Sequence, residues 1–189
     1  QRSGSDLILQ LKNSNDQICL SNWFGGEAFK LQTIEFADGT KLNTAQIEQW
    51  LDSVPILGTE VNDQLFGGGL TDRFYGLAGD DLLIGNAGND WLEGGRGKDF
   101  LAGGTGSDTY LFGLGDGSDV IKTSDLSLGM VEGHQDRLLF KSGITMSDLH
   151  FQRSGMDLMV TLYNPGDQIT ISSWFGGEDC KLQSIEFAD

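Results

Sequence analysis

A nine-residue repeat in the middle of the chain restricts most strongly what this sequence can fold into. Aspartate recurs every nine residues from residue 63 to residue 108, with a glycine five residues before it and a large apolar residue two residues after it. Repeats at a fixed period indicate a stacked architecture, because each unit can bury its apolar side chain only against its neighbours. The aspartates are Asp63, Asp72, Asp81, Asp90, Asp99 and Asp108; the glycines are Gly58, Gly67, Gly76, Gly85, Gly94 and Gly103; the apolar residues are Leu65, Phe74, Leu83, Leu92, Leu101 and Tyr110.

Each repeat divides into a glycine-rich turn of six residues that ends in aspartate and a strand of three residues with an apolar centre. Two turns and two strands make one coil of 18 residues, and stacked coils form two parallel sheets with the apolar row between them. Because successive turns alternate sides, residues 63, 81 and 99 share one edge and residues 72, 90 and 108 share the other. We therefore predict an all-β fold, a parallel β-roll flanked by modules of short strands, with one short α-helix near residues 44–53.

Apolar burial alone does not stabilise such a roll. One large apolar residue per repeat contributes about 2–3 kcal/mol of transfer free energy, whereas ordering nine residues costs roughly 10 kcal/mol or more of backbone entropy. The chain also carries a formal net charge of −16, so the carboxylates of each edge repel one another. We expect the roll to need an external cation. The same charge disfavours binding to nucleic acid or to anionic membranes, and no stretch is apolar and long enough for membrane insertion.

A second, longer repeat surrounds the first. Residues 1–38 align with residues 152–189 at a constant offset of 151, and 25 of the 38 positions are identical without a gap. We interpret this as one period of a tandem array in a longer parent protein, in which neighbouring modules are partners of this segment. The expected organisation is a first flanking module with the helix at 1–56, the roll at 57–121 and a second, truncated copy of the module at 122–189.

The flanking modules show the alternating apolar patterns that are typical of short strands. The predicted strands are residues 6–11, 16–21 and 31–36, their copies at 157–162, 167–172 and 182–187, and residues 136–140 and 148–151.

The helix would begin after Asn43 as N-cap, with Gln46 completing a capping box. Its apolar face would contain Ile47, Trp50, Leu51 and Val54.

Calcium is the cation that suits these repeats. It takes six to eight oxygen ligands at flexible geometry, and carboxylates and backbone carbonyls supply them where thiols and imidazoles do not. Aspartate provides charge, and glycine lets the carbonyls turn toward an ion. Several Ca²⁺ ions are therefore the expected cofactor.

Two stretches also resemble a known family. The run GGRGKDFLAGGTGSDTYL at 94–111 is similar to the nonapeptide repeats of the RTX (repeats-in-toxin) family, and DTYLFGLGDGSDVI at 108–121 is similar to the end of such blocks. The flanks, with DRLLF, a WF pair and IEFAD, resemble the haemolysin-type calcium-binding-related module of long secreted RTX proteins.

The resemblance implies that each ion lies between two turns on one edge, held by carbonyls and one aspartate from each turn. One site would use Leu77, Gly79 and Asp81 with Gly94, Arg96 and Asp99. A second would use Asn86, Gly88 and Asp90 with Gly103, Thr105 and Asp108. A third would use Gly95, Gly97 and Asp99 with Asp119, where the register shifts by two residues.

The first two repeats depart from this pattern, because Val61 and Leu70 occupy the fourth turn position, where the family has glycine. A bulky residue resists the backbone that would bring its carbonyl to an ion. We expect weaker or empty sites here, which would comprise Thr59, Val61 and Asp63 with Gly76, Ala78 and Asp81, and Gly68, Leu70 and Asp72 with Gly85, Ala87 and Asp90.

The aromatic pairs at 23–24 and 174–175 are interpreted as core, with a ligand-stacking platform as the alternative. Cys19 and Cys180 are interpreted as two buried free thiols, with a single disulfide as the alternative.

The two histidines, His134 and His150, have no partners at a spacing that would indicate a metal or catalytic site. Among the acidic residues that follow the roll, Asp116, Asp119 and Asp125, only Asp119 is predicted to reach an ion.

No enzyme is expected. The sequence contains no zinc-protease, serine-hydrolase or P-loop motif, and no Asp-Pro bond. The resemblance implies type I secretion from a Gram-negative bacterium, and folding on calcium outside the cell as a structural segment of a large toxin- or adhesin-like protein. The alternatives are an adhesin module with an unknown surface or protein ligand, and a non-catalytic domain of a secreted enzyme.

Overall fold

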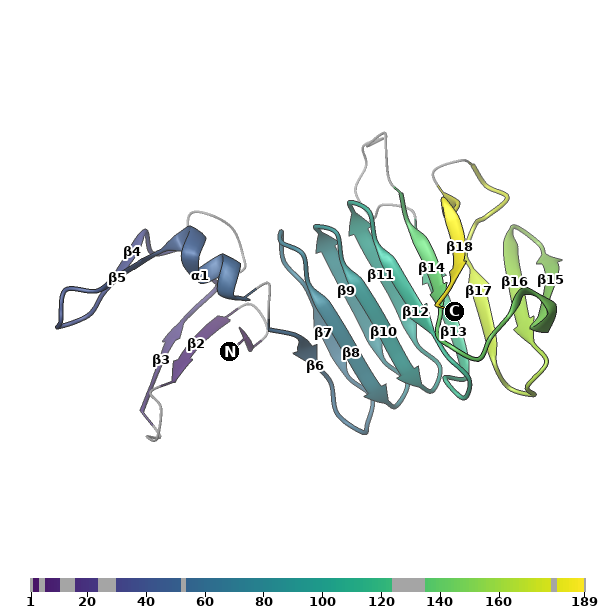
Figure 1. Cartoon of the computed structure of the whole chain (residues 1–189), viewed down its shortest axis with the longest axis horizontal. Coiled ribbons are helices and arrows are strands. Elements are labelled where there is room, and N and C mark those ends of the chain that lie inside the picture. Colours follow the sequence, from purple (N-terminus) through teal and green to yellow (C-terminus); the bar gives the residue numbers. More distant parts are fainter. Residues whose placement is uncertain are drawn as a thin grey trace.

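The computed structural model describes residues 2–3, 6–10, 16–23, 30–51, 54–123, 135–177 and 180–188. Its main body is a parallel β-roll of two facing sheets, as predicted (Figure 1). In one sheet, six strands lie in the order β18-β14-β12-β10-β8-β6. They are β6 Ile56–Leu57, β8 Arg73–Ala78, β10 Trp91–Arg96, β12 Thr109–Phe112, β14 Arg137–Phe140 and β18 Ser184–Phe187.

The other sheet has seven strands in the order β15-β16-β17-β13-β11-β9-β7. They are β7 Gln64–Phe66, β9 Leu82–Ala87, β11 Phe100–Thr105, β13 Ser118–Lys122, β15 Leu149–Ser154, β16 Asp157–Leu162 and β17 Gln168–Ile171. All neighbours are parallel except in the β15-β16-β17 meander, which is antiparallel and ends this sheet.

The register of the sheets confirms the 18-residue coil. Phe74 pairs with Leu92, and Leu92 pairs with Tyr110, so that equivalent apolar residues stack along one sheet. The other sheet pairs Leu83 with Leu101 in the same way. Alternate residues of each strand point between the sheets, which follows from the two-residue period of a strand.

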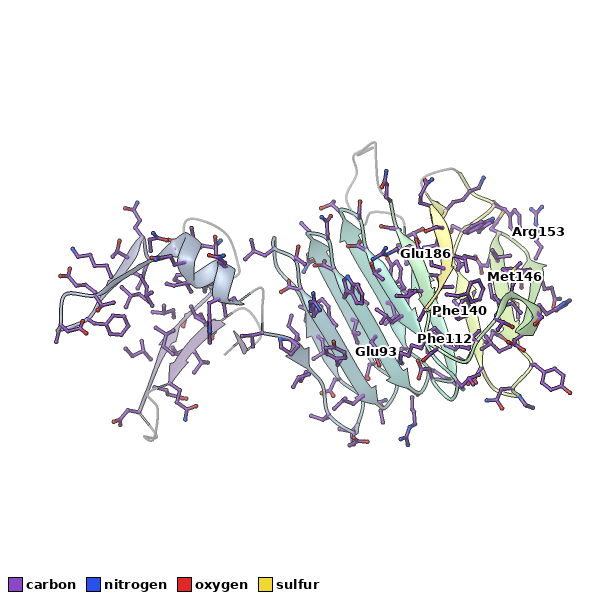
Figure 2. All side chains as sticks on the ribbon, in the orientation of Figure 1. Glu93, Phe112, Phe140, Met146, Arg153 and Glu186 are labelled. Atoms are coloured by element: carbon purple, nitrogen blue, oxygen red, sulfur yellow. The ribbon has the colours of Figure 1, made fainter. Side chains whose placement is uncertain are left out.

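The core of the roll is the row of apolar side chains between the two sheets. Of the six predicted members, five are buried and Leu65 is partly buried against the same cluster. The later end is thicker because Phe112, Phe140 and Ile144 join it. Phe112 and Phe140 meet edge to face, with ring centroids 6.2 Å apart (Figure 2).

The second copy of the flanking module continues the roll. Strand β14 pairs with β12, β17 pairs with β13, and β18 pairs with β14, all in parallel. A short 3-10 helix, Met146–Asp148, leads into β15. The strands expected in this copy are confirmed, and both sheets run across the boundary expected at residue 121, so the domain limits stay a prediction.

The first module forms a separate small body with its own core (Figure 1). Its strands are β1 Arg2–Ser3, β2 Asp6–Gln10, β3 Gln17–Leu20, β4 Thr33–Glu35 and β5 Lys41–Asn43, followed by helix α1 Thr44–Leu51. The buried core residues are Leu7, Trp23, Ile47 and Leu51.

The helix begins as predicted. The backbone N–H of Gln46 donates to Asn43 Oδ1 at 2.9 Å, and the N–H of Asn43 donates to Gln46 Oε1 at 3.0 Å, which completes the capping box. The predicted apolar face is wrong at Trp50, whose side chain is 54% exposed. Trp50 lies beside a groove in the first module rather than in its core.

Two further expectations have mixed outcomes. Trp23 is buried and Trp174 packs against the roll core, so the core interpretation is confirmed for both tryptophans. It is wrong for Phe175, which is 38% exposed and has the Arg153 guanidinium 4.3 Å from its ring centroid; Phe24 lies outside the described residues. Both cysteines are free, as predicted, but neither is buried, because Cys19 in β3 is exposed and Cys180 is half-buried. Within the described residues, no helix has the length and apolar character needed to cross a bilayer.

The roll core yields a stability prediction. Leu92 is 0% exposed between the sheets, so Leu92→Ala should lower the free energy of unfolding by about 2–5 kcal/mol through lost burial and a cavity. Leu114 is the matched control because it is 57% exposed in a turn. Leu114→Ala should change the free energy of unfolding by less than about 0.5 kcal/mol. Urea unfolding in saturating calcium measures both values; equal effects would contradict the assigned core.

Candidate metal sites along the two edges

The aspartates form a ladder along each edge of the roll. The backbone N–H of Asp63 donates to Asp81 Oδ1 at 2.8 Å, and the N–H of Asp81 donates to Asp99 Oδ1 at 2.8 Å. The N–H of Asp99 continues the series to Asp119 Oδ1 at 3.1 Å. Each carboxylate therefore links its own coil to the preceding coil, and the predicted alignment on one edge is confirmed.

The opposite edge repeats this arrangement. The N–H of Asp72 donates to Asp90 Oδ1 at 2.7 Å, and the N–H of Asp90 donates to Asp108 Oδ1 at 2.8 Å. The last step runs from the N–H of Asp108 to Asp136 Oδ1 at 2.9 Å. Both ladders place like-charged groups in a row with little solvent around them, since Asp81, Asp90, Asp99 and Asp108 are all buried.

The second carboxylate oxygen provides the test of whether a cation fits. Asp81 Oδ2 and Asp99 Oδ2 are buried and have no hydrogen-bond partner in the structure. A buried charged oxygen without a donor is strongly unfavourable in protein interiors. A cation bound between the two turns would satisfy both oxygens, so the residues present fit a hard metal ion.

Glycine at the first position of each turn makes room for the carboxylate. A Cβ atom on Gly94 would lie 2.2 Å from Asp99 Oδ2, and one on Gly76 would lie 2.4 Å from Asp81 Oδ2. The fourth position needs glycine for a different reason, because Gly79 and Gly97 have φ values of +121° and +147°. The recurrent glycines therefore allow the aspartate to fold back over its own turn.

The first two turns have a different backbone. Among described residues other than glycine, positive φ occurs only at Asn22, Leu77, Asn86 and Ser173. Val61 and Leu70 therefore do not adopt the conformation that glycine has at the fourth position of the later turns. This difference supports the expectation of weaker sites there, which stays a prediction.

Strand pairing brings the predicted ligands into adjacent turns. Leu77 pairs with Gly95, and the N–H of Gly79 donates to the Arg96 carbonyl at 2.9 Å, which places turns 76–81 and 94–99 side by side. Turns 85–90 and 103–108 meet in the same way, because the N–H of Gly88 donates to the Thr105 carbonyl at 2.9 Å.

The remaining predicted sets also involve neighbouring turns. Gly97 forms a bridge with Gly117, two residues before Asp119. For the first two repeats, the N–H of Ala78 donates to the Thr59 carbonyl at 3.3 Å, and that of Ala87 donates to the Gly68 carbonyl at 3.0 Å.

Within the described ranges, no three histidine, cysteine, aspartate or glutamate side chains gather as a metal site. An ion here would take two carboxylates, and backbone carbonyls would supply most of its other ligands.

Two family models match this sequence. The RTX calcium-binding nonapeptide repeat (4 copies) matches residues 57–91, 75–110 and 84–121, and the haemolysin-type calcium binding protein related domain matches residues 6–46 and 157–189. Residues 57–121 belong to the RTX calcium-binding nonapeptide repeat family. The RTX roll is accordingly a calcium-binding β-roll, and both resemblances drawn from the sequence are confirmed.

Two solved structures are similar to this RTX chain. One is the solution structure of the AlgE6R3 subunit of the mannuronan C5-epimerase from Azotobacter vinelandii, with 28% identity and a TM-score of 0.49 over 73% of this chain and 84% of that chain. The other is the solution structure of the AlgE6R2 subunit of that enzyme, with 23% identity and a TM-score of 0.47 over 69% of this chain and 94% of that chain. A comparison with curated proteins finds no match.

Sequence reasoning missed Asp136 as a member of the RTX ladder. It follows Asp108 by 28 residues rather than 18, so the nine-residue count does not reach it. The local sequence could have identified it. Asp136 is followed two residues later by Leu138, just as every repeat aspartate is followed two residues later by a large apolar residue.

Two other buried acids near the end of the RTX roll have partners of their own. Asp116 accepts from the N–H of Gly113 at 2.7 Å and lies 3.1 Å from the Lys141 ammonium. Asp167 accepts from the N–H groups of Gly115 and Gly117 at 2.9 and 3.1 Å. Both therefore stabilise turns. Among the other residues considered from the sequence, His150 is exposed, whereas His134 and Asp125 lie outside the described residues.

Burial perturbs the carboxylates of the ladder in the ion-free state. It raises the pKa of Asp119 to about 8 and that of Asp99 to about 6, and neighbouring carboxylates add to both increases. Burial also raises the pKa of Asp81. In each case the carboxylate also accepts a hydrogen bond from an N–H of the preceding coil. This bond lowers the pKa, but by less than burial raises it.

These pKa values give the ion-free RTX roll a pH dependence. Folded Asp99 and Asp119 bind protons more tightly than the unfolded chain does, so unfolding releases protons. Stability should therefore fall as the pH rises from about 4 to about 8, and level off above that range. Saturating calcium should abolish or reverse the slope, because the ion needs ionised carboxylates.

Far-UV circular dichroism of chelator-treated protein across this pH range measures the effect, with a calcium-saturated sample as control. An ion-free roll that becomes more stable as the pH rises would contradict the assigned burial.

Proposed function

We propose that the RTX roll is a calcium-dependent folding segment of an exported protein and has a structural rather than catalytic role. The observation that carries the proposal is the pair of buried oxygens, Asp81 Oδ2 and Asp99 Oδ2, which have no donor. Each lies in a row of like charges within a chain of net charge −16. A divalent cation would remove both penalties at once.

The proposed ligands are those of the sequence prediction. Turn 76–81 would bind one ion together with turn 94–99, and turn 85–90 would bind a second together with turn 103–108. A third ion would lie between turn 94–99 and Asp119. Asp136 extends the second edge in the same manner, so we add it as a candidate ligand beyond Asp108.

Calcium concentration would then decide whether the roll folds. Calcium modules outside cells bind at roughly 10⁻⁴–10⁻³ M, and binding to the folded state alone stabilises that state by linkage. Where calcium is scarce, the roll would remain unfolded and able to pass through a secretion channel. At extracellular calcium it would fold, as a type I-secreted toxin- or adhesin-like protein requires.

The alternative of a ligand-binding aromatic platform receives no support from the described residues. Trp23 is fully buried and Trp174 packs against the roll core. Phe175 is 38% exposed, but the Arg153 guanidinium lies 4.3 Å from its ring centroid. No observation therefore favours a second function over the structural one.

A calcium titration tests the proposal. Chelator-treated protein at neutral pH should gain β signal cooperatively in far-UV circular dichroism at about millimolar calcium, with little response to magnesium, which binds flexible oxygen sites less readily. A roll that is already fully folded without calcium would overturn the folding-switch proposal.

A matched pair of variants links this response to the ladder. Asp99→Asn should bind fewer calcium ions than the unmodified chain in equilibrium dialysis, because the variant removes a carboxylate shared by two proposed sites. Asp38→Asn makes the same charge change at an exposed turn of the first module and should bind the same number. Equal losses in the two variants would contradict the ligand assignment.

A further inference from the structure

The two copies of the 38-residue module have different surroundings in this structure. Residues 152–189 lie against the last strands of the RTX roll, whereas no described strand covers the equivalent face of residues 1–38. The offset of 151 equates Ile18 with Ile169, Ile34 with Ile185 and Phe36 with Phe187, and all three pairs are identical residues. The second copy therefore indicates what the face of the first copy is built to contact.

In the second copy this face is the continuation of the roll. Strand β17 pairs with β13, and the N–H of Gln168 donates to the Gly117 carbonyl at 2.7 Å. Ile169 is 0% exposed within the roll core. Phe187 stacks on Phe140 of β14, with ring centroids 5.5 Å apart. Both backbone pairing and apolar packing hold the module on the roll.

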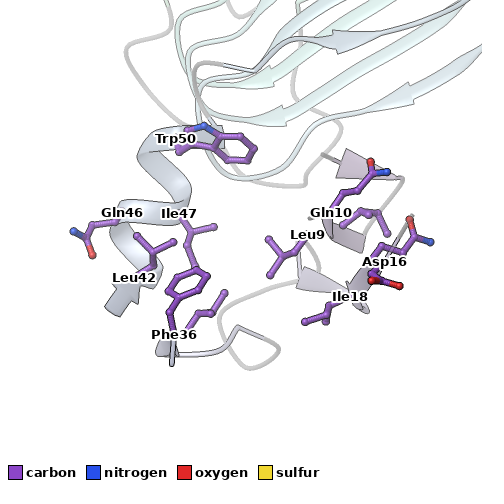
Figure 3. A pocket seen from close by; sticks show the side chains of 12 residues that line it. Leu9, Gln10, Asp16, Ile18, Phe36, Leu42, Gln46, Ile47 and Trp50 are labelled. Carbon is purple, nitrogen blue, oxygen red and sulfur yellow. The ribbon is translucent and has the colours of Figure 1, made fainter. Parts of the chain in front are cut away.

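In the first copy the same groups lie open. Strand β3 is the last strand in the order β1-β2-β3, so no described strand pairs with its outer edge. Ile18 is 61% exposed and Phe36 is 45% exposed. They line a largely apolar groove of about 620 Å³, with Leu9 and Ile18 on one side and Phe36 and Ile47 on the other (Figure 3).

We propose that this groove is the docking site for the end of another RTX roll, whose last strands correspond to β13 and β14 of this chain. The incoming β13 would extend the sheet beyond β3 in parallel, as β13 does with β17. The incoming equivalent of Phe140 would stack on Phe36. An open strand edge beside an apolar groove is the pattern that strand addition uses, because main-chain hydrogen bonds and side-chain pockets act together.

In this proposal the module joins two rolls. Its groove would bind the last strands of the preceding roll, and helix α1 would lead into the next roll, as α1 precedes β6 here. The occupant must itself be folded, so the proposal rests on the calcium-dependent folding proposed above.

A chain with an added roll tests the docking directly. A copy of residues 39–151 is placed ahead of residue 1, so that the first module follows a roll at the spacing that the second module has. In saturating calcium, hydrogen exchange of peptides spanning β3 should slow by roughly tenfold or more relative to the original chain, because strand pairing protects amides. These peptides differ in sequence from those of β17, so mass spectrometry distinguishes them.

The identical residues Ile18 and Ile169 give matched variants. In the original chain, Ile169→Asp should lower the urea midpoint and Ile18→Asp should leave it unchanged. In the extended chain, Ile18→Asp should abolish the protection of β3.

Two results would overturn the proposal. One is unslowed hydrogen exchange of β3 in an extended chain whose added roll is shown to be folded by circular dichroism. The other is concentration-dependent protection of β3 in the original chain that Ile18→Asp removes, which would assign the face to a dimer. Because folding and docking have separate readouts, a roll that folds without calcium would refute the folding switch alone.

Discussion

The hydrogen bond from one aspartate N–H to the carboxylate of the equivalent aspartate in the next coil is the interaction on which the roll depends. It sets the spacing of the coils on both edges and fixes each carboxylate in the interior of a turn. The same bond creates the electrostatic problem, because it aligns charged groups that repel one another where little water reaches them. Neighbouring coils are thus joined by groups that also destabilise the ion-free stack.

The other features of the roll follow from this constraint. Glycine is needed wherever the carboxylate folds back over its turn, because a Cβ on Gly94 would collide with Asp99 Oδ2. The thin row of apolar residues adds burial but leaves the charges uncompensated. At the last coil, two further buried acids have protein partners, since Lys141 lies beside Asp116 and the N–H groups of Gly115 and Gly117 donate to Asp167. The second module then covers the exposed end of both sheets.

The sequence predicted those parts of the fold that repeat. The nine-residue period was sufficient for the two parallel sheets and for the two aspartate edges from residue 63 to residue 108, because strict spacing translates into strict register. The shifted Asp119 lies off this period and was predicted from the family resemblance. The period did not reach Asp136, since an insertion breaks the count even though the ladder continues across it. The positions of Trp50 and Cys19 were misjudged because helical or apolar patterning identifies a face but not whether a neighbour covers it. For the ligand sets, sequence and geometry agree on which turns are adjacent, which is what ions shared between turns require.

A crystal grown in calcium, with anomalous scattering measured at long wavelength, locates those ions most directly. The account predicts anomalous peaks between turns 76–81 and 94–99 and between turns 85–90 and 103–108, each within ligand distance of both aspartates, with weaker or no peaks beside Val61 and Leu70. Full peaks beside Val61 and Leu70 would refute the effect of the altered first turns. A calcium-grown roll with no peak between Asp81 and Asp99 would contradict the central claim that a cation neutralises the carboxylate ladder.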